Sequence, residues 1–193
     1  MRRMHSAVTI LAGGALCLSA VFWTASGGEK INPKLVKRGE YLVTTTGCGD
    51  CHTPMVMGPN GPERDMKHML AGHPQELAMP PAPKLPPGPW MATVSATMTA
   101  WAGPWGVSYT RNLTPDKETG LGDWTAENFI ATMRTGRRMG KGRQILPPMP
   151  FDVFAKMTDD DLKSIFAYLQ TIPVVKNKVP EPVAPETPPP GMK

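Results

Sequence analysis

The pattern of apolar positions predicts three amphipathic helices, over residues 33–46, 125–136 and 158–172. Each begins at a residue type that caps helices well, namely Asn32, Thr125 and Thr158. Gly136 and Pro173 end the second and third helices. The apolar residues that recur at helical spacing are Leu35, Val36, Tyr41 and Leu42, then Phe129, Ile130 and Met133, then Leu162, Ile165, Phe166 and Leu169. A further helical turn or two is expected at 152–157, and because no convincing strand pattern is present, the sequence predicts an all-α chain.

Proline and glycine interrupt this helical pattern in two blocks. The chain of 193 residues has 23 prolines and 19 glycines, and most of the prolines lie between Pro54 and Pro104 or between Pro173 and Pro190. Regular helix and central strand are not expected there. We therefore predict one domain over residues 29–175 with a long irregular insertion at 54–108, followed by an extended Pro-rich tail at 176–193.

The N-terminal segment resembles an export signal. Arg2 and Arg3 precede an uncharged run over residues 6–28. Small residues near its end would suit a signal peptidase, yet the run is also long enough to span a bilayer as an anchor. Residues 1–28 are thus a signal peptide or a membrane anchor. Both alternatives place the rest of the chain in the periplasm or otherwise outside the cytoplasmic membrane.

The stretch GCGDCHT contains Cys48 and Cys51, the only cysteines outside the N-terminal segment, followed at once by His52. A thioredoxin-like pair is disfavoured, because a proline-rich stretch follows in place of a helix. An exported zinc-binding module built from Cys48, Cys51, His68 and His73 has nearly the right spacing but leaves His52 unexplained. Covalent haem uses all three residues, the thiols to bind the porphyrin and the imidazole as proximal iron ligand. One CxxCH motif predicts one covalent haem c.

The second axial ligand must come from the 14 methionines or the remaining histidines. Met149 lies in LPPMPF, where Pro148 and its neighbours stiffen a loop between two predicted helices. A rigid loop can present a thioether to iron. We predict Met149 as this ligand and Pro148 as a haem contact, with Met139, His68 and His73 as the alternatives for the ligand.

GCGDCH after a helix, LPPMPF in a loop and a final DLKSIFAYLQ helix together resemble a class I c-type cytochrome over residues 32–180. In that family the first and last helices cross, which would place Gly39 close to Ile165 and Tyr168. The segment WGVSYTRNLTPDKETGLGDWTAENF is similar to haem domains in the cytochrome subunits of bacterial membrane-bound alcohol dehydrogenases and related dehydrogenases. This resemblance implies that the loop at 112–115, beginning with Asn112, packs along the haem edge and that Trp124 lies near the propionates.

The same resemblance implies an electron-transfer protein and no enzyme of its own, since a haem iron with both axial positions filled has no open site for substrate. Its partners would be redox proteins, a dehydrogenase subunit upstream and a cytochrome or terminal oxidase downstream. Two features depart from those subunits, which often carry three haem domains. CxxCH occurs once here, and the Pro-rich connection is longer than theirs.

Positive charge is concentrated just before the Met149 loop. The formal net charge is +5. A run without acidic residues holds Arg134, Arg137, Arg138, Lys141 and Arg143. The run is either a solvated loop or a docking surface for an acidic redox partner. Nucleic acid is not expected as a partner, because the protein is exported and the run has no interleaved aromatic residues.

Overall fold

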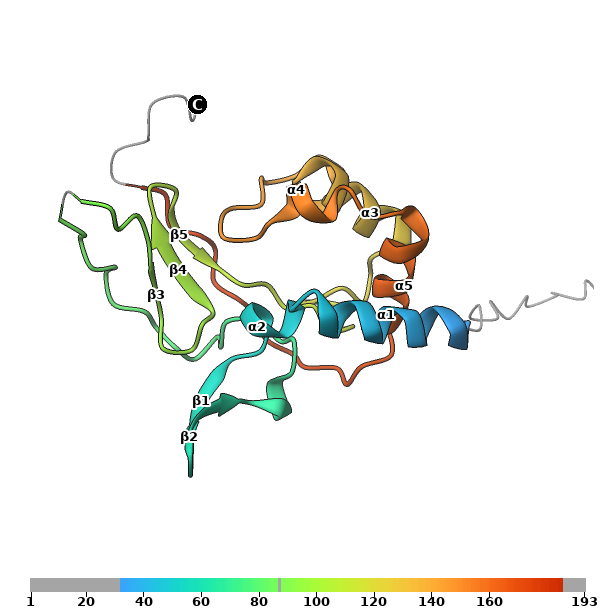
Figure 1. Ribbon diagram of the computed structural model, residues 1–193, viewed down its shortest axis with the longest axis horizontal. Coiled ribbons are helices and arrows are strands. Elements are labelled where there is room, and N and C mark those ends of the chain that lie inside the picture. Colours follow the sequence, from blue (N-terminus) through green and yellow to red (C-terminus); the bar gives the residue numbers. More distant parts are fainter. Residues whose placement is uncertain (1–31, 87, 186–193) are drawn as a thin grey trace, which may run out of the picture. The chain divides into compact units, whose positions relative to one another are not determined.

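The predicted helices are confirmed, with their caps, in the computed structural model, which describes residues 32–86 and 88–185. Asn32 accepts a hydrogen bond from the Lys34 amide (3.0 Å), Thr125 forms a capping box with Asn128, and Thr158 accepts from the Asp161 amide (3.1 Å). Gly136 ends its helix in the left-handed conformation, with φ 62°. The α-helices are α1 (Pro33–Thr45), α2 (Cys48–His52), α3 (Ala126–Thr135), α4 (Phe151–Phe154) and α5 (Asp159–Leu169) (Figure 1). Two 3₁₀ turns, η1 (Met66–His68) and η2 (Arg138–Gly140), lie in the connections.

The first and last helices pack directly against each other at Gly39. A Cβ placed on Gly39 would collide with the Ser164 carbonyl oxygen and would lie 2.8 Å from the Tyr168 Cβ. Only glycine allows the two backbones to approach this closely. The expected crossing of α1 and α5 near Gly39 and Tyr168 is therefore confirmed, and it accounts for a glycine in the middle of a helix.

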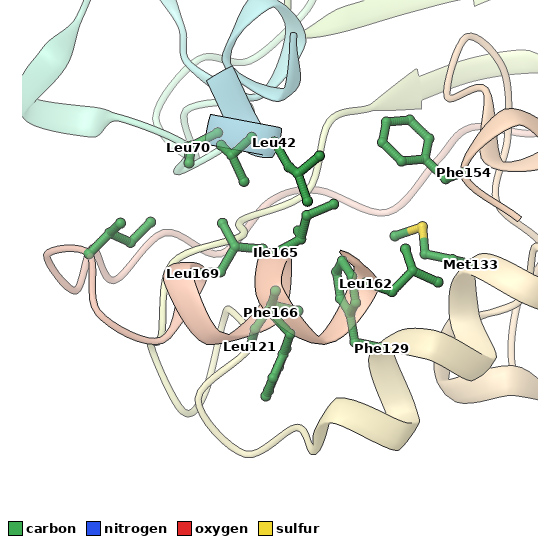
Figure 2. Packing of buried hydrophobic residues seen from close by; sticks show 12 residues of the cluster. Leu42, Leu70, Leu121, Phe129, Met133, Phe154, Leu162, Ile165, Phe166 and Leu169 are labelled. Atoms are coloured by element: carbon green, nitrogen blue, oxygen red, sulfur yellow. The ribbon is translucent and has the colours of Figure 1, made fainter. Parts of the chain in front are cut away.

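The core is formed by the apolar faces of α1, α3 and α5 (Figure 2). Leu162, Ile165 and Leu169 of α5 are almost fully buried. They pack in one cluster with Leu42 of α1 and Phe129 of α3. Cys48, Met69, Leu113, Trp124 and Met149 are partly buried against this cluster. The edge of the core is thus lined by the segments that carry the predicted haem residues.

The prediction of an all-α chain is wrong for the insertion, which contains two antiparallel sheets. One is a hairpin of β1 (Met55–Gly58) and β2 (Gly61–Arg64), and the other has the order β3 (Thr93–Val94), β4 (Ala100–Gly103), β5 (Gly106–Tyr109) (Figure 1). These strands are two to four residues long, too short for an alternating pattern to stand out. Each hairpin is closed by the same turn, Gly-Pro-x-Gly, at 58–61 and 103–106. The insertion is therefore not irregular throughout.

The described chain after α5, as far as residue 185, is extended and lies against this chain's own residues. Val183 pairs with Val107 of β5 through two backbone hydrogen bonds of 2.8 and 2.9 Å. Asn177 and Val179 are buried. None of the helices within residues 32–86 and 88–185 is long and apolar enough to cross a membrane. The predicted signal or anchor at 1–28 lies outside the described residues.

Candidate functional site

Helix α2 places both cysteines on one side of a single helical turn. Gly47 precedes it with φ 69°, a left-handed conformation that turns the chain sharply out of α1. Cys48 and Cys51, three residues apart, are neighbours on the helix surface. Both thiols are free and half-buried, and burial raises the pKa of each. Two protonated thiols on one helical turn, with Cys48 packed against the apolar core, are a suitable arrangement for forming two thioether bonds.

The His52 ring is oriented by a backbone carbonyl 59 residues further along the chain. Its Nδ1 lies 2.7 Å from the Arg111 oxygen. A carbonyl only accepts, so Nδ1 carries the proton and Nε2 keeps its lone pair. Nε2 has no partner among the described residues. Burial lowers the pKa of His52, which keeps the ring neutral as a metal ligand must be, and the bond to Arg111 opposes that shift.

The loop beginning at Asn112 is held by hydrogen bonds within the protein. The buried Asn112 amide donates to Thr119 Oγ1 (3.1 Å) and to the Val175 carbonyl (2.8 Å). Its oxygen accepts from the amide and the hydroxyl of Thr114, at 2.9 and 2.8 Å. The hydrogen-bonding capacity of Asn112 is thus used inside the chain. Any contact of Asn112 with haem would be a packing contact, as expected for a loop along the haem edge.

Trp124 retains an unused hydrogen-bond donor. It is half-buried at the edge of the core, and its indole N–H has no acceptor within the described part of the chain. The Arg138 guanidinium lies over its ring, 5.6 Å from the centroid. A donor beside a cation is an arrangement that accommodates a carboxylate, so it suits the predicted place near the propionates.

Met149 lies in a loop that the insertion braces. Ser108 of β5 donates its hydroxyl to the Pro147 carbonyl at 2.6 Å, and the Pro147–Pro148 peptide bond is cis. Pro148 is exposed, whereas Met149 is half-buried against the core cluster. The alternative Met139 is held to α3 by its amide, which donates to Thr132 Oγ1 at 2.9 Å.

The structure does not support the alternative zinc module. Both ring nitrogens of the buried His73 have protein partners, Nδ1 with Thr99 Oγ1 (2.9 Å) and Nε2 with the Leu77 carbonyl (3.0 Å). His68 is exposed and bonds Asp65 at 2.5 Å. Among the described residues, no group of three or more His, Cys, Asp or Glu side chains could hold a metal ion. Both nitrogens of His73 are engaged within the protein, which also disfavours His73 as an axial ligand to iron.

The residues present fit a covalently attached haem. Two free thiols precede a histidine whose tautomer leaves Nε2 free, and Cys48 packs against the apolar core cluster. The donor set of sulfur, nitrogen and thioether is the one that haem iron and its porphyrin accept in electron-transfer proteins. Fold and site together define a helical protein for covalent haem.

Comparison with known proteins agrees with this class. The family described as Cytochrome c matches residues 36–173, and the chain belongs to this family. It is a c-type cytochrome, which carries covalent haem and transfers electrons. The chain is 28% identical over 170 residues to the alcohol dehydrogenase (quinone) cytochrome c subunit of Gluconobacter oxydans (strain 621H), covering 86% of this chain and 28% of that protein.

Two further relatives are also cytochrome subunits. The chain is 32% identical over 136 residues to the fructose dehydrogenase cytochrome subunit of Gluconobacter japonicus, covering 70% of this chain and 21% of the relative. It is 30% identical over 154 residues to the gluconate 2-dehydrogenase cytochrome c subunit of Pantoea cypripedii, covering 80% and 27%. The chain thus spans between a fifth and a third of the length of these relatives.

Sequence reasoning missed three contributors to the site. Arg111 acts through its backbone carbonyl, which no side-chain pattern reveals. Gly72, with φ 79°, donates its amide to the His52 carbonyl (2.8 Å) and packs against the Arg111 carbonyl. Asn177 lies in the segment predicted as an extended Pro-rich tail, and its side-chain amide donates to the carbonyls of Ala71 and His73, on either side of Gly72. The only sequence signal for Gly72 was the glycine itself, within Ala-Gly-His at 71–73, because glycine is typical of tight turns.

Proposed function

We propose that this chain is an exported monohaem c-type cytochrome that relays single electrons between a dehydrogenase or respiratory complex and a downstream acceptor. Cys48 and Cys51 would hold the porphyrin by thioether bonds, with His52 as proximal ligand and Met149 as distal ligand. When bound, haem supplies an iron that cycles between Fe(III) and Fe(II). The observation that carries the proposal is the His52 ring, whose Nδ1 donates to Arg111 and whose Nε2 is left for iron, next to two free thiols.

The surrounding residues support one haem and a position for its carboxylates. CxxCH occurs once in the sequence. Trp124 offers an indole N–H beside the Arg138 guanidinium, a pair that would bind a propionate. The Asn112 loop would pack along the haem edge through its apolar atoms, because its polar atoms are engaged. Pro148 would limit the freedom of the neighbouring Met149.

Met149 is the best-supported distal ligand for two reasons. It is half-buried against the core, so its thioether already lies in an apolar environment that favours ligation over solvation. Its loop is tied to β5 by the bond from Ser108 to Pro147. A thioether ligand and an apolar pocket both favour the reduced iron and therefore a high reduction potential.

The partners would be redox proteins, and the names of the relatives suggest a dehydrogenase as electron donor. Location outside the cytoplasmic membrane is supported by the sequence of residues 1–28, as a signal peptide or anchor. Basic side chains on the connection before the Met149 loop would attract an acidic partner. Arg134 is engaged with Asp159 (2.5 Å), whereas Arg137 and Lys141 are exposed and form no ion pair with any described residue.

An absorption spectrum tests this proposal. The protein, made in a host that matures c-type cytochromes, should show sharp α and β bands on reduction, and the colour should stay with the polypeptide through acid-acetone extraction. A His52→Ala variant should keep the thioether-bound pigment but lose the sharp low-spin bands. Colour lost to the solvent phase would contradict covalent attachment, and unchanged bands in His52→Ala would remove His52 as ligand.

A further inference from the structure

The segment over residues 175–183 is here called the C-terminal strap. It lies alongside the stretch that contains Arg111, whose carbonyl is the acceptor for His52. The Val175 carbonyl accepts from the Asn112 amide (2.8 Å) and from the Thr114 hydroxyl (3.1 Å). At the other end, Val183 pairs with Val107 of β5. Figure 1 shows the C-terminal strap running beside β5. The strap is thus attached to the chain on both sides of Arg111.

Arg111 connects the strap to the proximal ligand. Its carbonyl accepts the Nδ1 proton of His52 at 2.7 Å. Its guanidinium donates to the carbonyls of Val179 (3.2 Å) and Pro180 (3.0 Å) and to the Glu181 carboxylate (2.6 Å). The planar fork of an arginine makes such contacts in a defined geometry, so they restrict where the Arg111 backbone lies.

Asn177 provides a second, independent attachment. Its buried amide donates to the carbonyls of Ala71 (2.7 Å) and His73 (2.9 Å), and its oxygen accepts from the Gln75 amide (2.9 Å). Gly72 lies between these two carbonyls and donates to the backbone oxygen of His52 at 2.8 Å. Through Asn177, the strap therefore holds the 71–75 segment, which bonds the His52 backbone. Through its contacts with Arg111, it holds the residue whose carbonyl bonds the His52 ring.

We infer that the C-terminal strap sets the orientation of the proximal ligand: Arg111 and Asn177 are positioning residues that hold the His52 ring through the Arg111 carbonyl and the 71–75 segment. The inference rests on the proposed role of His52 as haem ligand. A hydrogen bond from Nδ1 to a fixed acceptor increases the donor strength of a ligating imidazole and fixes its plane. Loosening the strap should weaken that bond without removing the acceptor.

Replacing Arg111 by methionine tests the link directly, because the variant keeps the backbone carbonyl and loses the three strap contacts. In the reduced holoprotein, NMR measures the exchange rate of the His52 Nδ1 proton with solvent. We expect exchange to be faster by about tenfold or more, since three hydrogen bonds are lost and each contributes on the order of a two- to tenfold factor. The matched control is Arg38→Met, which breaks the Arg38–Asp161 pair (2.9 Å) on α1 and α5. Its exchange rate should equal that of the wild type.

An Asn177→Ala variant provides a second measurement that involves no change of charge. A weaker Nδ1 hydrogen bond reduces the stabilisation of Fe(III), so the reduction potential should rise, together with faster Nδ1 exchange. In the same experiment, the Arg38→Met control should keep the wild-type exchange rate of the His52 Nδ1 proton. If either variant folds with wild-type proton exchange, the strap has no positioning role through that residue, and the inference is overturned when both do. A wild-type protein without haem bands would instead refute the proposed function itself.

Discussion

The close packing of Gly72 against the Arg111 carbonyl can be tested by adding one methyl group. A Cβ at Gly72 would lie 2.6 Å from the Arg111 carbonyl carbon and 2.7 Å from its oxygen, and it would collide with the Thr110 oxygen. Gly72 is also at φ 79°, where a side chain costs about 1–2 kcal/mol. Overpacking at a buried site adds about 1–3 kcal/mol. Gly72→Ala should therefore reduce the free energy of unfolding by about 2–5 kcal/mol.

Gly61→Ala is the matched control. Gly61 also has positive φ, 120°, but a Cβ there meets nothing within 4 Å. Gly61→Ala should therefore lose only the free energy that a side chain costs at positive φ, on the order of 1–3 kcal/mol, because its methyl group overlaps with nothing. Guanidinium chloride unfolding of the two holoproteins, followed by helical circular dichroism, gives both values. Because the overlap displaces the acceptor of His52, only Gly72→Ala should also change the His52 Nδ1 proton signal of the reduced protein.

The two variants together allow a clear refutation. Equal destabilisation by Gly72→Ala and Gly61→Ala would mean that the added methyl group meets no resistance from the 110–111 backbone. A large destabilisation with an unchanged Nδ1 proton signal would mean that the backbone shifts without moving the carbonyl of Arg111. Either result would remove the argument that this glycine shapes the proximal side of the site.

Three further variants address the distal ligand and the docking surface. Met149→Ala, unlike Met139→Ala, should lower the reduction potential, open the iron to added ligands such as cyanide and abolish the far-red sulfur-to-iron band of the oxidised protein; retention of that band would assign the ligand elsewhere. Electron-transfer rates with an acidic partner should fall as salt rises, because exposed charges are screened beyond roughly 10 Å at 0.1 M. Replacing Arg137 and Lys141 by glutamine should flatten this dependence in stopped-flow experiments, while Arg138 is left intact because it stacks on Trp124. A wild-type rate indifferent to salt would identify the run as an ordinary solvated loop.

The helices were predictable because their signals are local. Asn32, Thr125 and Thr158 cap helices through hydrogen bonds to amides two or three residues away, and these bonds are present. Gly39 was a less direct signal, one for close packing of α1 against another helix. A glycine that weakens a helix indicates close packing, and the crossing with α5 supplies the cause.

The sheets of the insertion were not predicted, because strands of two to four residues depend on distant partners more than on their own pattern. The repeated Gly-Pro-x-Gly turns at 58–61 and 103–106 were the local signal that could have found them. The prolines around these turns argue against central strands, although proline is tolerated in turns and at sheet edges. The composition of the segment therefore concealed two short hairpins.

The strap was beyond sequence reasoning for a different reason. A Pro-rich stretch has no helical or strand periodicity, yet a single buried Asn177 side chain can make three backbone contacts. The acceptor for His52 is likewise a backbone oxygen, identical in every residue type. The motif residues could be named from their spacing, whereas the residues that orient them required the tertiary structure.

The central claim is that one haem is bound covalently through Cys48 and Cys51, and an intact mass of the denatured protein tests it most directly. The protein should be isolated from a host with a c-type cytochrome maturation system, unfolded in acid and weighed alongside a variant with both cysteines changed to serine. We predict the mass of the polypeptide plus one haem for the wild type and of the bare polypeptide for the variant. A wild-type polypeptide at its bare mass, with any haem released separately, would contradict the account.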